Sequence, residues 1–166
     1  MPLSLTDLVT GGGAVEGRLR QPIPIKAFPR LAETLLDPGG TVDVDIRVSR
    51  APTGVPLIEG RMAGTFRPAC QRCLEPVDMP IEVELRLAVT GASGLVPAGM
   101  ERWESDEAGV ILRDLLEDEL ILALPMVARH DDPAQCGDMA RRADETAERP
   151  PGRENPFAVL RGLKRD

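Results

Sequence analysis

Aromatic residues are nearly missing from this sequence, whose 166 residues include three Phe, one Trp and no Tyr. A hydrophobic core must therefore be filled by Leu, Val, Ile and Met. The hydrophobic content of 42% and the charged content of 28% are those of a globular protein. The length allows one ordinary domain with room for tails.

Signals for membrane insertion and secretion are lacking as well. The chain contains no stretch of about 18 apolar residues, which a membrane-spanning helix needs. It also has no charged N-terminal segment followed by an apolar run. An odd number of cysteines, three, without a secretion signal is typical of a reducing compartment. We expect a cytoplasmic protein that makes no contact with a membrane.

Sequence motifs of common enzyme classes do not occur either. There is no P-loop, no GxGxxG segment and no nucleophile elbow, and the single histidine, His130, has no serine near it in sequence. Four acidic residues are interpreted as the solvated face of a helix and not as an acid–base group: Asp114, Glu117, Asp118 and Glu119. We therefore predict that the protein is not an enzyme and has no small-molecule substrate.

The charge of the chain is negative and unevenly distributed. A net charge of -7 argues against a strongly basic nucleic-acid module. From Arg18 to Arg72, however, nine Lys or Arg residues stand against five Asp or Glu residues, whereas from Glu101 to Glu119 eight acidic residues stand against two Arg. The chain could carry a local basic face, and the alternative is that these charges are simply solvated.

Hydrophobic and polar residues alternate in three segments, 41–49, 57–68 and 81–89. This period of two predicts strands with one buried face, and the short turns between them predict an antiparallel meander. Gly60 and Gly64 predict a bend or a bulge in the second strand.

Other segments predict the elements around this meander. Residues 15–25 contain two prolines, so any strand there lies at an edge. The segments 26–40 and 110–125 have helical spacing, and the acidic, glycine-rich segment 90–109 is interpreted as a loop. The predicted fold is α+β, an antiparallel β-meander or partly closed barrel with two flanking helices and a flexible C-terminal tail.

The tail is predicted to have two parts, which follow a single α+β domain at residues 1–139. Residues 140–154 are polar and are interpreted as a flexible linker. Residues 155–166 are predicted to form a short helical docking motif, in which Asn155 caps the helix, Pro156 occupies its first turn, and Phe157, Leu160 and Leu163 share one face. The motif either reaches a partner or folds back on its own sheet.

Two of the three cysteines, Cys70 and Cys73, are only three positions apart. A CxxC in a tight turn directs two thiolates at one point, which is half of a tetrahedral zinc site. Cys136 and His130 would complete it, and this set uses every Cys and His in the chain. Three alternatives stay open at this point: structural buried thiols with a surface histidine, a redox pair, and a tight corner that presents Arg72 to a partner.

Three blocks of sequence carry a resemblance to a known family. In this order they are CQRCLEP at 70–76, LLEDELILALPMVARHDD at 115–132 with the later Cys136, and NPFAVLRGLK at 155–164. Together they resemble the bacterial YceD proteins, which are named large ribosomal RNA subunit accumulation proteins. Some relatives have several cysteines after the LP pair, whereas this chain has only His130 and Cys136 there.

The resemblance implies a non-enzymatic ribosome-biogenesis factor that acts in the synthesis, processing or stability of 23S rRNA. Its partner would be this RNA or a large-subunit precursor with its ribosomal proteins. Four arginines are the candidates for phosphate or partner contacts: Arg67, Arg72, Arg61 and Arg50. The alternative is a protein–protein adaptor with a structural zinc or cysteine corner and no direct RNA contact.

Overall fold

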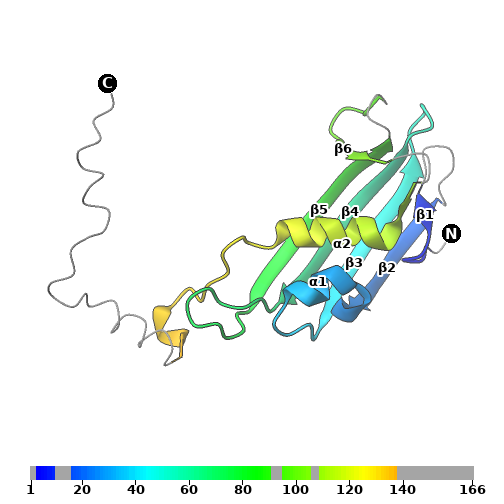
Figure 1. Cartoon of the computed structure of the whole chain (residues 1–166). Helices are drawn as coiled ribbons and strands as arrows, with labels where there is room; N and C mark the ends of the chain where they lie inside the picture. Colours follow the sequence, from blue (N-terminus) through cyan, green and yellow to red (C-terminus); the bar gives the residue numbers. More distant parts are fainter. Residues whose placement is uncertain (1–2, 10–15, 91–94, 106–108, 138–166) are drawn as a thin grey trace, which may run out of the picture.

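One five-stranded sheet organises the protein (Figure 1). The computed structural model describes residues 3–9, 16–90, 95–105 and 109–137. The strands lie in the spatial order β2-β3-β4-β5-β6, where the first four neighbour one another antiparallel and β6 runs parallel to β5. Their bounds are Gly17–Pro24 for β2, Thr41–Arg50 for β3, Pro56–Phe66 for β4, Met79–Thr90 for β5 and Glu101–Glu104 for β6.

The three predicted alternating segments are the three long central strands. In β3 every second side chain is buried, which is the reason that a period of two indicates a strand with one face in the core. These residues are Val42, Val44, Ile46 and Val48. The α+β class and the antiparallel meander are therefore confirmed.

Position 60 requires a glycine, because no side chain fits there. Its φ of +145° lies in the region that favours glycine, and a Cβ there would collide with the backbone of Asp45 and Ile46 in the neighbouring strand. The pairing of β4 with β3 nevertheless runs without an inserted residue through Gly60 and Gly64. The glycines thus permit close strand approach in a continuous ladder, and no bulge forms.

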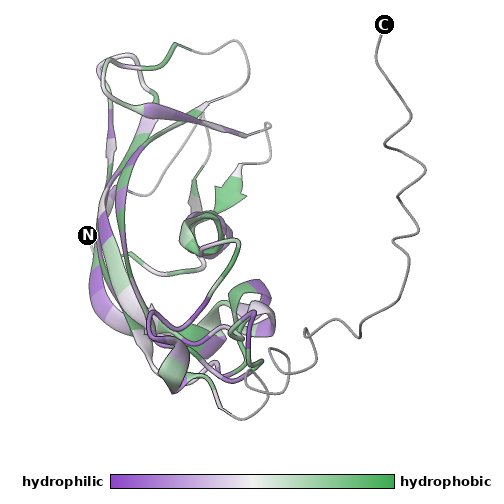
Figure 2. Cartoon of the chain, turned by 90° about the vertical axis from the view of Figure 1, so that its left-hand side faces the viewer, coloured by the Kyte–Doolittle hydropathy of each residue, from purple (hydrophilic) through white to green (hydrophobic). Residues whose placement is uncertain are grey.

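Of the two predicted forms, a meander or a partly closed barrel, the meander describes the sheet better, because the sheet is open. Its edges are β2 and β6, and within the described residues these two strands are not paired with each other. Figure 2 shows that the sheet curves around α2 (Leu112–Ala123), which lies on its concave side. Since this helix covers the apolar face, the core is buried without closure.

The sequence predicts the edge strand β2 but not the edge strand β6. Pro22 and Pro24 lie in β2, as expected for an edge strand, because proline cannot donate to a ladder. The strand β6 lies in the segment interpreted as a loop. Its sequence ERWE has no alternation of buried apolar residues, and only Trp103 is partly buried.

Short elements complete the domain. The strands β1 (Leu8–Val9) and β7 (Val110–Ile111) form a separate antiparallel pair next to α2. The first predicted helix is shorter than its segment and consists of a 3₁₀ turn, η1 (Ile25–Ala27), and α1 (Pro29–Thr34). A second 3₁₀ turn, η2, spans Pro133–Gln135. Among the described helices, none has the length and apolar character to cross a membrane.

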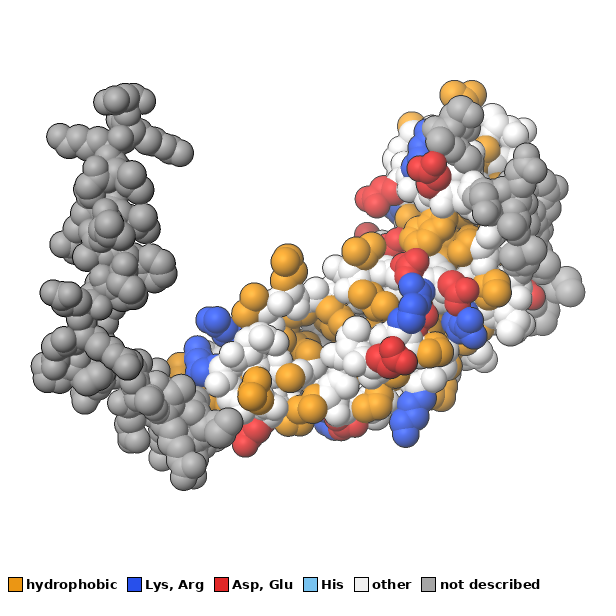
Figure 3. All heavy atoms as spheres, in the orientation of Figure 1, with side chains coloured by type: hydrophobic (Ala, Val, Ile, Leu, Met, Phe, Trp, Pro, Cys, Tyr) orange, Lys and Arg blue, Asp and Glu red, His pale blue; other side chains and the backbone are white. Residues whose placement is uncertain are grey.

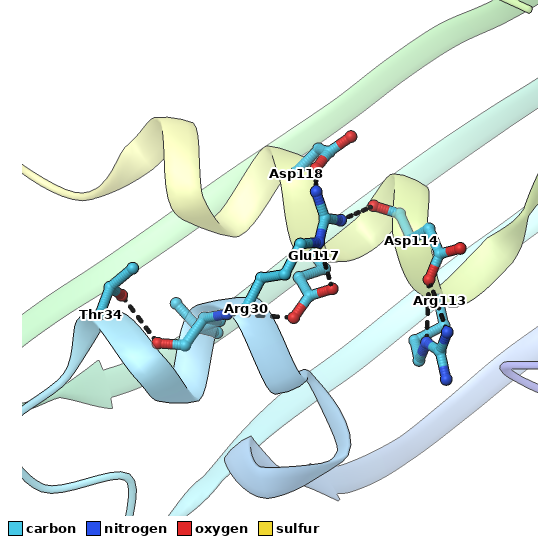
Figure 4. A network of polar contacts seen from close by, with 7 residues as sticks. Arg30, Thr34, Arg113, Asp114, Glu117 and Asp118 are labelled. Atoms are coloured by element: carbon cyan, nitrogen blue, oxygen red, sulfur yellow. Dashed lines mark hydrogen bonds and ion pairs between the residues drawn. The ribbon is translucent and has the colours of Figure 1, made fainter.

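One acidic residue of α2 is buried, contrary to the prediction of a fully solvated acidic face. The Glu117 carboxylate accepts hydrogen bonds from the Leu31 backbone N–H and from Arg30 Nε, both at 3.0 Å (Figure 4). Arg30 also pairs with Asp118. The carboxylate thus supplies a cap to α1, whose own N-cap residue, Phe28, provides no side-chain hydrogen bond.

Candidate metal centre

The first pair of cysteines lies in a tight hairpin after β4. The hairpin is closed by hydrogen bonds from Cys70 N–H to the Glu75 carbonyl and from Leu74 N–H to the Cys70 carbonyl, each 2.8 Å long. Ala69 and Pro76 form an isolated antiparallel bridge across it. We call residues 68–77 the knuckle. The turn makes the two thiols face the same side, so both Cys70 and Cys73 are buried.

The second pair of candidate ligands reaches the knuckle through the loop that follows α2. The helix ends at Ala123, before Pro125, and the loop runs back along the knuckle, where Gln71 N–H donates to the Ala128 carbonyl at 2.8 Å. Farther along, the Asp132 side chain accepts from Ala134 N–H and begins η2. This turn carries Cys136 back towards the histidine at position 130.

The structure brings the four predicted metal ligands to one point. The candidate donor atoms of Cys70, Cys73, His130 and Cys136 all lie within 4.8 Å of one another. The Sγ atoms of Cys70 and Cys136 are 4.0 Å apart, and His130 Nδ1 lies 3.6 Å from the sulfurs of Cys73 and Cys136. A tetrahedral zinc with bonds of about 2.3 Å to sulfur and about 2.0–2.1 Å to nitrogen separates its ligand atoms by about 3.8 Å and 3.6 Å.

These distances fit a metal better than a disulfide. All three cysteines are free thiols, and 4.0 Å is about twice the length of an S–S bond. Three sulfurs and one imidazole form a soft donor set with the spacing of a tetrahedron, which favours zinc among the common metals.

Burial and hydrogen bonds at the sulfur atoms shift the pKa values of the thiols in the candidate site. Burial raises the pKa of Cys70, but the N–H groups of Cys73, Arg72 and His130 direct their dipoles at this sulfur and lower the pKa to about 5. For Cys136, burial is the largest cause and raises the pKa; the hydrogen bond from Arg72 opposes it, and the neighbouring thiols raise the pKa further. The thiolate form needed by a metal is therefore already favoured at Cys70.

A second, small apolar cluster surrounds the candidate ligands. It contains Val77 and Ala128 together with the three cysteines, and it is separate from the main core between the sheet and α2. With four protein donors and buried sulfurs, the arrangement is that of a closed structural site, because a catalytic zinc keeps one position for water or substrate.

Two candidate contact arginines, Arg50 and Arg61, lie on the sheet. Arg50 ends β3, donates to the Gly54 carbonyl at 2.7 Å and lies 3.7 Å from the Glu16 carboxylate. Arg61 is exposed on the outer face of β4, at 3.7 Å from Glu82. Both guanidinium groups thus have an acidic neighbour.

The other two arginines lie near the knuckle and have closer partners. Arg67 is held between Asp37 at 2.9 Å and Asp78 at 2.7 Å. Arg72 is half-buried, and its Nη1 donates to Cys136 Sγ at 3.6 Å. The structure therefore does not gather the four arginines into one patch, and it directs Arg72 inwards, at a candidate metal ligand.

Two residue roles escape the sequence analysis. Glu117 lies three positions before the buried Leu120, and this spacing could have indicated an inward direction. The contact of Arg72 with Cys136 joins positions that are 64 residues apart, and no local pattern signals it. The predicted docking residues Asn155, Pro156, Phe157 and Leu160 lie outside the described residues.

Comparisons with known proteins place the site inside a matched region. The sequence model of the family described as "Large ribosomal RNA subunit accumulation protein YceD" matches residues 58–164, which include all four candidate ligands. A curated protein of the same description from Haemophilus influenzae is 32% identical over 145 residues, covering 81% of this chain and 80% of that protein. No solved structure matches the chain.

Proposed function

The chain belongs to the YceD family of large ribosomal RNA subunit accumulation proteins, and we propose on this basis that it is a non-enzymatic ribosome-biogenesis factor. It acts in the synthesis, processing or stability of 23S rRNA, in the cytoplasm. Its partners are this RNA or a large-subunit precursor with its ribosomal proteins. The observation that carries the proposal is the match of the family model to residues 58–164, together with that of the curated relative over 80% of its length.

A structural zinc is the second part of the proposal. Cys70, Cys73, Cys136 and His130 would hold it, and the convergence of these donor atoms within 4.8 Å supports the assignment. Bound zinc would supply a cross-link that ties the loop after α2 to the knuckle. Such sites contribute folding free energy and no chemistry of their own.

Elemental analysis of protein produced in zinc-supplemented medium tests the metal. We expect one zinc per chain in the wild type and none in Cys136→Ser after dialysis against a weak chelator. Gln135→Ser, an exposed neighbour in the same turn, should keep its zinc. A wild-type protein free of zinc, or a Cys136→Ser protein that retains it, contradicts the proposed site.

Complementation tests the rRNA role separately from the metal. In a bacterial strain that lacks its own copy of this gene, the wild-type chain should restore the ratio of 23S to 16S rRNA. Cys136→Ser should restore it less well than Gln135→Ser, because the knuckle and loop are no longer cross-linked. If the ratio does not respond to the wild-type chain at all, the rRNA role is wrong.

Direct RNA contact would best use the outer face of the sheet. An open hollow of about 970 Å³ lies there, and four exposed arginines line it: Arg18, Arg47, Arg61 and Arg86. Within the described part of the chain, Arg47 and Arg86 make no ion pair, so their guanidinium groups are available to phosphates. Acidic residues share this face, among them Asp45, which Arg18 binds at 2.8 Å.

A salt titration of binding to a 23S fragment tests this surface. Phosphate contacts release counterions, so affinity should fall steeply with salt, and Arg47→Gln with Arg86→Gln should reduce the slope of log K against log salt by about two. Arg102→Gln, on the strand at the edge of the sheet, is the matched control. A slope that the double variant leaves unchanged removes this face from the proposal.

The second candidate function is a protein–protein adaptor that makes no RNA contact. Two observations favour the adaptor: the net charge of the chain is -7, and all four predicted contact arginines already contact other side chains of the protein. Pull-down from a lysate with and without nuclease separates the two functions. Partners that survive nuclease treatment support the adaptor, and partners that disappear support RNA contact.

A further inference from the structure

Exposed apolar side chains gather at the end of the domain that holds the candidate metal ligands. Leu74 in the knuckle is 61% exposed, and Met126 and Val127 in the loop after α2 are 99% and 55% exposed. These two segments are joined by the hydrogen bond between Gln71 and Ala128. Figure 3 shows hydrophobic side chains over this end of the described domain. We call these three residues the metal-end surface.

The backbone at Leu74 indicates that its side chain has a use outside the fold of the knuckle. Its φ is 63°, and it is the single non-glycine residue with a positive φ among those described. Glycine adopts this conformation without the steric cost that a leucine incurs. The leucine is also largely exposed, so packing within the domain does not explain its presence.

The chain leaves the described domain next to this surface. Gly137, the last described residue, lies against Glu75, because a Cβ built on the glycine would be 2.8 Å from the Glu75 carboxylate. Glu75 directly follows Leu74. Residues 138–166 therefore start beside the metal-end surface, and the family match continues through them to residue 164.

We infer that the terminal segment 155–166 packs on the metal-end surface of its own chain. The segment offers the complementary chemistry, since Phe157, Leu160 and Leu163 recur at the spacing of one helix face. A helix this short is marginal in water without a surface to cover. Packing it on the metal-end surface buries apolar side chains on both sides.

The length of the connection is sufficient for this docking. Eighteen peptide steps separate Gly137 from Asn155, and a flexible chain of that length has a root-mean-square span of about 23 Å. Such a tether holds the segment at an effective concentration in the millimolar range. Even a weak contact, with a dissociation constant of about 0.1 mM, would then be occupied about 90% of the time.

Charges around the surface complement the segment. Three acidic residues, Glu75, Asp131 and Asp132, are exposed in the knuckle and the loop, against one exposed arginine there, Arg129. The terminal segment carries Arg161, Lys164 and Arg165 against one acidic side chain, that of Asp166. Because these charges are opposite in sign, they favour docking of the segment on the surface and help to fix its orientation. The inference goes beyond the rRNA role and does not depend on it.

Hydrogen exchange measured by mass spectrometry on the full-length, zinc-loaded protein tests the docking. Amides of residues 126–129 should exchange about tenfold more slowly in the wild type than in Phe157→Ser with Leu160→Ser, because the segment covers them. Ala158→Ser lies outside the apolar stripe and should behave as the wild type. An unchanged far-ultraviolet circular dichroism spectrum of all variants shows that the domain itself stays folded, while the melting temperature of the tail variant should fall slightly because a docked segment stabilises the native state.

A reciprocal variant changes the surface and leaves the segment intact. Leu74→Gly with Met126→Ser should release amides 157–163 to faster exchange, whereas Leu95→Ser, 78% exposed in the segment between β5 and β6, should not. Zinc content measured on the same samples tests the metal independently.

Three outcomes would overturn the inference. Exchange of residues 126–129 that changes less than twofold in the tail variant shows that the segment lies elsewhere. Protection that disappears on dilution, together with a dimer in light scattering, assigns the surface to a second copy. Protection that arises only after a ribosomal fraction is added assigns the segment to a partner.

Discussion

Replacing Glu117 tests the contacts of the one charged residue that is buried among the described residues. Its side chain is 2% exposed, whereas that of Arg30, its partner, is 52% exposed. The carboxylate receives two hydrogen bonds, one from a buried backbone N–H and one from a half-exposed guanidinium. These two donors respond differently to its loss, because Arg30 can return to water and the Leu31 N–H cannot.

The size of the effect follows from this difference. Glu117→Gln keeps an oxygen for Leu31 N–H and loses the charge, so it exchanges a charged hydrogen bond for a neutral one and should cost about 1 kcal/mol. Glu117→Ala leaves Leu31 N–H buried without an acceptor, which costs about 1–3 kcal/mol, and loses the burial of one methylene group, Cγ, at about 0.8 kcal/mol. We expect a total of about 2–4 kcal/mol for Glu117→Ala, somewhat less than the loss of about 3–5 kcal/mol when one partner of a fully buried ion pair is removed.

Urea denaturation followed by circular dichroism measures these changes in the free energy of unfolding. Asp118→Asn is the matched control, since it also loses a contact with Arg30 but is 35% exposed, and it should cost less than about 1 kcal/mol. If Glu117→Ala costs no more than Asp118→Asn, Glu117 does not cap α1, and the reasoning from the burial of this contact is wrong.

Three further predictions concern the metal centre and the charged surface. Chelation should raise hydrogen exchange in residues 68–77 and 124–137 and leave the sheet protected, because the ligands belong to a cluster separate from the main core; loss of the far-ultraviolet dichroism of the sheet would contradict this. Arg72→Gln should speed alkylation of Cys136 in the zinc-loaded protein about tenfold, since the guanidinium donates to its sulfur, and the exposed Arg129→Gln should not. Asp45→Asn should lower the urea midpoint at pH 7. The hydrogen bond from Arg18 lowers the pKa of Asp45 below its unfolded value of about 3.9, so this stabilisation is present above that pH and disappears as the pH falls through the lower, folded pKa. A difference between variant and wild type that does not shrink as the pH falls below about 3.9 would refute the pairing.

The burial of Glu117 also limits what the acidic segment Glu117–Glu119 can contact. This segment belongs to one of the sequence blocks that resemble YceD proteins. Glu117 points into the domain, whereas Asp118 and Glu119 are partly exposed. Like charges at Glu101 and Asp118, together with burial, raise the pKa of Glu119, burial being the larger cause. One member of the segment is therefore needed for the junction of the two helices, and only the other two can face a partner.

Local patterns in the sequence determined the elements and their class. Alternation of apolar and polar residues identified β3, β4 and β5, because adjacent side chains of a strand point to opposite faces whatever the rest of the chain does. The prolines of β2 placed it at an edge for an equally local reason, the missing N–H. The candidate metal ligands were a complete set for another simple reason, since the chain has no other cysteine or histidine.

Contacts between distant parts of the chain decided the rest. The curvature of an open sheet, the parallel addition of β6 and the burial of Glu117 all depend on where α2 packs, which no single segment encodes. The distance between Cys70 and Cys136, which are 66 positions apart, depends on the return of a loop to the knuckle. Arg72 donates to the sulfur of Cys136, and only folding brings that acceptor within 3.6 Å. Periodicity reports which face of an element is apolar, but the partner of a side chain is set by the tertiary structure, where free energy depends on the burial and pairing of groups far apart in sequence.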